Sequence, residues 1–130
     1  MSLEVAAALI AAGLFLGMAA FQASLALGAP LGGYVLGGRH PGMLPARLRA
    51  FSAFAAAILV LGALVILARA SVIGWPLGAA SLLAPACWAM AAFLVLNTFG
   101  NLTSKSRLER TVFAAMTAAL TVLCACVALS

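Results

Sequence analysis

The stretch from Gly28 to Arg49, GAPLGGYVLGGRHPGMLPARLR, interrupts a sequence that is otherwise almost entirely apolar. Six of the twelve glycines and three of the five prolines fall between Gly28 and Pro45. Glycine and proline at this density predict turns and not a continuous helix. The apolar runs on either side are about 20 residues long, which is the length that crosses a bilayer. We therefore expect the stretch to be a compact, basic connector between two transmembrane helices.

The composition of the whole chain is that of a membrane protein. Of its 130 residues, 67% are hydrophobic and 7% are charged, whereas about 25% of the residues of a soluble domain are charged. A soluble fold of this length cannot cover so much apolar surface. The formal net charge is +5, but the few cations lie between apolar blocks. This arrangement argues against nucleic acid as a partner and makes anionic lipid headgroups the expected counter-charge.

Four apolar segments predict four transmembrane helices. A spanning segment must satisfy its own backbone hydrogen bonds, so it is either a helix or a strand of a closed barrel. The period-two alternation of barrel strands is absent. The expected fold is an all-α integral membrane bundle forming a single domain over residues 1–130, with helices at about 5–27, 50–68, 77–99 and 111–129. Because no positive charge precedes the first apolar run, we interpret it as a retained helix and not as a signal peptide.

The distribution of lysine and arginine predicts the orientation. Six of the seven lie in or beside the two connections at residues 28–49 and 100–110, and Arg69 alone lies on the opposite side. Since basic loops stay in the cytoplasm, these two connections should face inward and both termini outward.

A candidate site is expected where these connections meet the ends of the helices. Amide side chains and cations gather there, and they comprise Gln22, Arg39, His40, Arg47, Arg49, Asn97, Asn101, Lys105, Arg107 and Arg110. One interpretation is that the amides join neighbouring helices. The other is a headgroup or anion pocket, in which glycines let backbone N–H groups approach a phosphate and arginines clamp it.

Catalytic, cofactor-binding and metal-binding residues are not predicted. His40 has no carboxylate near it in its loop, so no acid–base pair can be assigned. The glycines lack the strand and the GK[ST] sequence of a nucleotide-binding loop. The three cysteines lack metal-ligand spacing, and Cys124 and Cys126 point to nearly opposite faces of a helix. No ionisable residue lies at membrane depth, where coupled transporters commonly place one, and an enzymatic function is disfavoured.

Two local patterns predict packing and a helix boundary. Gly13 and Gly17 form a GxxxG pair, which we expect to pack against residues 50–68 or 111–129 of the same chain, with dimerisation as the alternative. Ser106 and Glu109 form a capping box, in which the glutamate should reach back to the backbone of the serine. Pro85 is expected to kink residues 77–99.

The turns resemble those of a known group of proteins. Leu25-Ala-Leu-Gly-Ala-Pro-Leu-Gly, then Gly37-Gly38 and Leu44-Pro45, and finally Asn97-Thr-Phe-Gly100-Asn101, are similar to turns of small uncharacterised bacterial membrane proteins with four predicted helices. The resemblance covers well under half of the chain. It implies a multi-pass protein of the bacterial cytoplasmic (inner) membrane, and it carries no activity.

Two classes of function stay open from the sequence. The first is a structural or accessory membrane protein that binds lipid or a larger membrane complex through its helix faces and basic loops. The second is a small oligomeric transporter or pore without a buried coupling carboxylate. The apolar helix faces favour the first class, and a wet cavity lined by Gln22 and Asn97 would favour the second.

Overall fold

Four long helices make up most of the computed structural model, which describes residues 1–75, 78 and 80–130. They are α1 (Leu3–Ala26), α2 (Ala46–Arg69), α3 (Leu83–Leu102) and α4 (Ala114–Leu129). The 3₁₀ turns η1 (Gly32–Tyr34) and η2 (Leu36–Gly38) lie in the glycine-rich loop, η3 (Ala80–Leu82) leads into α3, and a π-helical turn, η4 (Glu109–Phe113), leads into α4. The part of the chain that the structure describes contains no strand. The all-α prediction is confirmed. Four helical spans are long and apolar enough to cross a membrane, and the last two include the turns η3 and η4; they are Leu3–Ala26, Ala46–Arg69, Ala80–Leu102 and Glu109–Leu129.

The helix boundaries differ from the predicted ones for physical reasons. Helix α2 begins at Ala46, directly after Pro45 at the N-cap, and not at about residue 50. The first turn, with Arg47 and Arg49, is helical but polar, so hydropathy alone does not include it. Pro85 lies in the first turn of α3 and not in its interior, so its missing N–H removes no interior helical bond. The predicted start of this helix at Leu77 lies outside the described residues.

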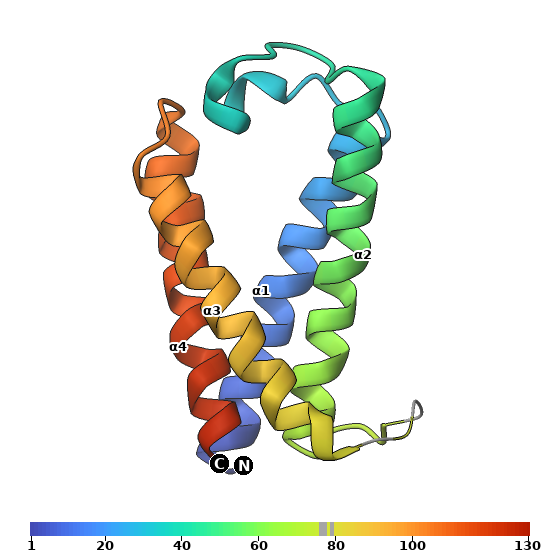
Figure 1. The fold of residues 1–130 in the computed structure, drawn as a ribbon, viewed down its shortest axis with the longest axis vertical. Helices are drawn as coiled ribbons and strands as arrows, with labels where there is room; N and C mark the ends of the chain where they lie inside the picture. The colour runs from blue at the N-terminus through green and yellow to red at the C-terminus, as the bar shows by residue number, and fades with distance from the viewer. Residues whose placement is uncertain (76–77, 79) are drawn as a thin grey trace.

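The helices form two antiparallel hairpins that separate at one end. Helices α1 and α2 make one hairpin, and α3 and α4 make the other (Figure 1). The hairpins pack together near the chain termini, and the glycine-rich loop spans between them at the opposite end (Figure 1). Apart from Ser52, the buried residues of α2 run from Gly62 to Ala68, and those of α3 run from Leu83 to Leu94. Both helices are therefore buried mainly in the half away from the loop.

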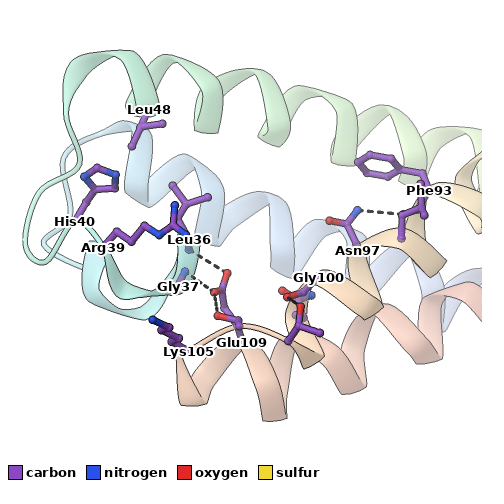
Figure 2. A pocket seen from close by; sticks show the side chains of 14 residues that line it. Leu36, Gly37, Arg39, His40, Leu48, Phe93, Asn97, Gly100, Lys105 and Glu109 are labelled. Atoms are coloured by element: carbon purple, nitrogen blue, oxygen red, sulfur yellow. Dashed lines mark hydrogen bonds between the residues drawn. The ribbon is translucent and has the colours of Figure 1, made fainter.

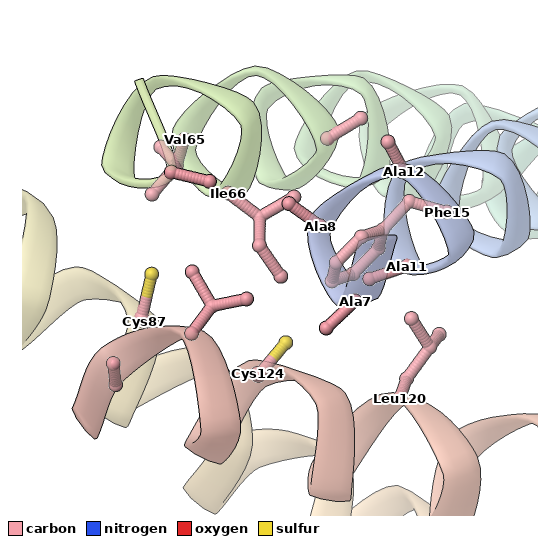
Figure 3. Packing of buried hydrophobic residues seen from close by; sticks show 14 of the residues in the cluster. Ala7, Ala8, Ala11, Ala12, Phe15, Val65, Ile66, Cys87, Leu120 and Cys124 are labelled. Carbon is pink, nitrogen blue, oxygen red and sulfur yellow. The ribbon is translucent and has the colours of Figure 1, made fainter. Parts of the chain in front are cut away.

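The main core uses small side chains to bring the helices together. Ala8 and Ala11 of α1 are fully buried beside Ile66 of α2 and Leu120 of α4 (Figure 3). At Gly62 of α2, an added Cβ would lie 3.2 Å from a ring carbon of Phe15. Such close approach through small residues is how helices associate in lipid, where burial of apolar surface gives no driving force.

The GxxxG pair does not contribute to this core. Gly13 and Gly17 are exposed, and a Cβ at either position would meet no atom within 4 Å. The alanine face of α1 makes the internal contacts instead, contrary to the expectation that the glycine pair packs within the chain. Dimerisation through Gly13 and Gly17 stays a prediction.

Few polar side chains lie within the helical bundle. The Thr98 hydroxyl of α3 donates to the Thr117 hydroxyl of α4 at 2.9 Å, and Thr117 is buried. Cys87 and Cys124 are free thiols in the core, whereas Cys126 is exposed on the other face of α4. At the end of the molecule away from the loop, Arg69 donates to the backbone oxygens of Ala128 and Ser130, which suits a cation at a helix C-terminus.

Candidate functional site

A small second core fastens the glycine-rich loop to the helices. Leu25, Val35 and Leu44 are buried there, and the rings of Phe21 and Phe113 meet edge to face with centroids 5.1 Å apart. These contacts tie the loop to the loop-proximal end of α1 and to the turn η4. The loop therefore has a defined position, which in turn positions the polar groups that it carries.

The side chain of Glu109 joins the glycine-rich loop to the α3–α4 connection. Its two carboxylate oxygens accept the backbone N–H groups of Leu36, at 3.1 Å, and Gly37, at 3.0 Å (Figure 2). The Ser104 hydroxyl donates to the same carboxylate. Leu36 and Gly37 both have positive φ, 51° and 72°. Successive backbone N–H groups that converge in this way form an anion-binding concavity.

The capping box is therefore only half formed. The Ser106 hydroxyl accepts the N–H of Glu109 at 3.4 Å, as predicted. The glutamate does not reach back, because the N–H of Ser106 donates to the Ser104 hydroxyl at 3.0 Å. The Ser106 hydroxyl donates to the backbone oxygen of Tyr34 at 2.6 Å, which adds a second tether between the two connections. The side chains of Ser106 and Glu109 thus bind the glycine-rich loop to the α3–α4 connection, and Ser106 also caps the start of the following helix.

A cleft of about 660 Å³ lies beneath the glycine-rich loop, between this loop, α2 and α3 (Figure 2). One end of the cleft is charged and the other is apolar. The lining residues are Leu36, Gly37, Arg39, His40, Leu48, Phe93, Leu96, Asn97, Gly100, Asn101, Thr103, Ser104, Lys105 and Glu109.

The α3 wall of the cleft changes character along the helix. Phe93, Leu96, Asn97, Gly100 and Asn101 lie at helical spacing on the face that lines the cleft. The first two residues are apolar and the last three are polar or small, and Lys105 follows beyond the helix end. The Asn97 amide N–H donates to the backbone oxygen of Phe93 at 3.3 Å, which leaves its carbonyl free to accept. The wall thus runs from apolar through amide to cationic.

The structure brings half of the predicted site residues into the cleft. Arg39, His40, Asn97, Asn101 and Lys105 line it.

The other half of the predicted set does not line the cleft, and these residues are Gln22, Arg47, Arg49, Arg107 and Arg110. The Arg49 guanidinium donates to the backbone oxygen of Ala26 and so caps α1. The Arg110 guanidinium donates to the backbone oxygens of Ser104 and Lys105. Arg47 and Arg107 are exposed.

Sequence reasoning missed Glu109 as a site residue and the apolar wall of the cleft. The spacing of Phe93, Leu96 and Asn97 is a signal that could have identified the wall. By contrast, Glu109 is separated from Leu36 by 73 residues, and no sequence pattern marks that contact.

Fold and cleft together define a class of protein. The chain is all-α, its four helices are compatible with a multi-pass membrane protein, and one end of it carries a cleft with cations and an apolar wall. Among the described residues, no group of His, Cys, Asp and Glu could hold a metal ion. No protein-family model matches the chain, and neither a curated protein nor a solved structure matches it significantly.

Proposed function

We propose that this chain is an integral protein of the bacterial cytoplasmic membrane and that it binds an anionic lipid at its cytoplasmic end, in a structural or accessory role. The cleft beneath the glycine-rich loop is the observation that carries the proposal. Its volume of about 660 Å³ falls within the range of roughly 300–1,000 Å³ typical of small-molecule sites. It combines Arg39 and Lys105 with the apolar side chains of Phe93 and Leu96, and this combination suits an amphiphile with a negative headgroup.

The exposed surface supports the membrane location. Phe51, Phe54, Leu96 and Phe99 each expose 63–70% of their surface. So many exposed large apolar side chains in one chain are unusual for a soluble monomer, whereas hydrocarbon chains of a membrane would cover them at no cost. The six basic residues at the loop end support a cytoplasmic location for that end, and the lipid would then belong to the inner leaflet.

The cleft accommodates a phospholipid in one direction. The phosphate lies at the cationic end, where the Arg39 guanidinium and the Lys105 ammonium offer charge-assisted hydrogen bonds. The amides of Asn97 and Asn101 lie one helical turn nearer the apolar end, at the level of the ester groups. An acyl chain follows Phe93 and Leu96 into the bilayer between α2 and α3.

Replacing Arg39 and Lys105 together by glutamine is expected to weaken phosphatidylglycerol binding by more than about tenfold. Each lost bond between a charged donor and a phosphate costs about 1.5–3 kcal/mol, and about 1.4 kcal/mol is tenfold in affinity. The purified protein is titrated with phosphatidylglycerol in detergent, and lipid retention is measured by native mass spectrometry.

The matched control is the pair Arg47→Gln and Arg107→Gln. It removes the same charge from the same end of the molecule. All four side chains are exposed, but Arg47 and Arg107 do not line the cleft. Its expected effect is less than about threefold, as for solvent-screened charges. Equal losses in the two double variants would show diffuse attraction of anionic lipid and overturn the cleft as the site.

A small oligomeric transporter is the second candidate, because the residues that line the cleft all belong to the loop half of the described chain. Asn97 lines the cleft, as a polar path would require, but Gln22 does not. The fully buried Ile66, Leu120 and Val127 fill the opposite end. Proteoliposomes that hold the protein should therefore leak no more phosphate or small cations than empty liposomes. Flux that depends on Asn97 would favour the transporter.

A further inference from the structure

We propose that Glu109 is an internal occupant of the phosphate subsite in the cleft. Its carboxylate fills the backbone anion site made by Leu36 and Gly37, and the phosphate of the bound lipid displaces it. Displacement frees the glycine-rich loop from the α3–α4 connection, so that lipid binding changes the cytoplasmic surface. The inference rests on the proposed function and describes how that same site is regulated.

The geometry around the carboxylate is that of a bound anion. Two successive N–H groups, at 3.1 Å and 3.0 Å, each donate to a separate oxygen of Glu109. The Ser104 hydroxyl donates to one of these oxygens. A phosphate presents oxygens that accept in the same way, and consecutive N–H groups of this conformation are a recurrent phosphate-binding element. Leu36 adopts a φ of 51°, which is uncommon for a residue with a side chain, and this conformation lets both N–H groups point at one anion.

The anion site opens into the cleft that we assign to the lipid. Leu36, Gly37 and Glu109 line it together with Arg39 and Lys105. Glu109 contributes the negative charge among these lining residues, and the two cations are the groups that would hold a phosphate. A carboxylate and a phosphate cannot accept the same N–H groups at once, and their like charges repel. Binding of a phosphate at the cationic end therefore competes with Glu109.

Displacement has a structural consequence because the loop has few polar tethers. Apart from the carboxylate of Glu109, the polar link shown between the two connections is the Ser106 hydroxyl, which donates to Tyr34. The apolar contacts of Val35 and Leu44 hold the loop to α1 and η4, and the cluster includes none of residues 103–108. Release of Glu109 would thus let the loop move away from this connection.

The variant Glu109→Gln tests the competition. Glutamine is nearly isosteric but carries no charge, so the phosphate meets a neutral competitor. Phosphatidylglycerol is expected to bind the variant about tenfold more tightly than it binds the wild type. Ser106→Ala is the matched control, since it removes the other tether without changing the charge of the cleft. Its affinity for phosphatidylglycerol should stay within about threefold of the wild-type value. If Glu109→Gln does not fold, Glu109→Asp keeps the charge but reaches less far, and it should also bind more tightly.

A distance measurement tests the release of the loop directly. Spin labels are placed by Gly33→Cys and Arg107→Cys in a Cys126→Ser background, where the remaining thiols of Cys87 and Cys124 are buried. The inter-label distance should lengthen when phosphatidylglycerol is added, and inorganic phosphate at the same concentration serves as the second arm. Lengthening with inorganic phosphate as well would support the displacement and assign the subsite to any phosphate.

Four results would each overturn a stated part of this account. If lipid binds but the inter-label distance is unchanged, or if Glu109→Gln binds lipid no more tightly than the wild type, the displacement is overturned. If Arg39→Gln with Lys105→Gln leaves lipid binding unchanged, the proposed function itself fails. Equal gains in Ser106→Ala and Glu109→Gln would assign the effect to a loosened loop and overturn the competition.

Discussion

Replacing Gly32 by alanine is expected to lower retention of phosphatidylglycerol about tenfold or more while leaving the helices intact. Gly32 is buried, and its N–H donates to the backbone oxygen of Gly42 at 2.8 Å. An added Cβ would lie 1.9 Å from the backbone oxygen of His40 and 2.6 Å from that of Gly42. Backbone atoms cannot rotate out of the way, so the segment from His40 to Gly42 must shift by about 1 Å or more.

This shift would act on the cleft because of where the loop residues lie. Arg39 and His40 line the cationic end of the cleft, and both belong to or adjoin the displaced segment. The main core, with Ala8, Ala11 and Ile66, uses the first half of α1 and the last turns of α2, and the hairpins pack together at the end of the molecule away from the loop (Figure 1). Helix content by circular dichroism should therefore equal that of the wild type, and lipid retention by native mass spectrometry should fall about tenfold or more, as for loss of a charged contact.

Gly33 offers a control one residue away. A Cβ there would meet Pro41 at 3.8 Å and 3.9 Å, which is ordinary van der Waals contact. Gly33→Ala should thus retain lipid like the wild type. If the two alanine variants bind phosphatidylglycerol equally well, the position of the loop backbone does not set the cleft.

Sequence patterns predicted the class of fold because the bilayer imposes strong rules. Twenty apolar residues in a row, broken by glycine and proline, leave few alternatives to spanning helices. The predicted helix boundaries were less accurate where polar residues belong to a helix. Arg47 and Arg49 are polar but helical, since a helix can continue past the apolar segment that hydropathy detects.

The candidate site was predicted only in part, since charge patterns identify an end of the molecule but not a cleft. Arg39 and Lys105 line the cleft, whereas Arg49 caps α1 by donating to Ala26. An arginine near a helix end satisfies either role, and only the fold decides which one. Glu109 likewise fits two roles in the sequence, and its position at a helix start favoured that of a local cap. Its partners, the N–H groups of Leu36 and Gly37, come from a loop that only tertiary packing brings near.

The glycines show the same limit for helix packing. GxxxG is a pattern that sequence reasoning can find, but Gly13 and Gly17 face outward. Gly62 belongs to no such motif, and yet an added Cβ there would meet Phe15 of α1 at 3.2 Å and Met90 of α3 at 3.3 Å. Whether a glycine is needed for helix packing depends on which large side chains lie opposite it. Gly62 is separated from Phe15 by 47 residues and from Met90 by 28 residues in the sequence.

Replacing Gly62 by leucine is therefore expected to lower the free energy of unfolding by about 3 kcal/mol or more. Inserting a large side chain into a packed core typically costs about 1–3 kcal/mol, and here the leucine would press on two helices at once. Phe15 is 3% exposed and has no free space to enter, so the two hairpins must separate at their common core. The purified variant should unfold at a clearly lower temperature in detergent. The core should also open to reagents, so that the thiols of Cys87 and Cys124 become reactive to a maleimide.

Gly13→Leu is the matched control for this prediction, because the substitution is the same and the site is an exposed helical glycine with nothing within 4 Å of the added Cβ. Its unfolding temperature and thiol reactivity should match those of the wild type. A loss of stability at Gly13 as large as at Gly62 would mean that the outward face of α1 is itself packed, as dimerisation through Gly13 and Gly17 requires. That outcome would be visible independently, since the variant would then elute from size exclusion at a smaller size than the wild type. If both variants match the wild type, the close approach at Gly62 does not hold the hairpins together.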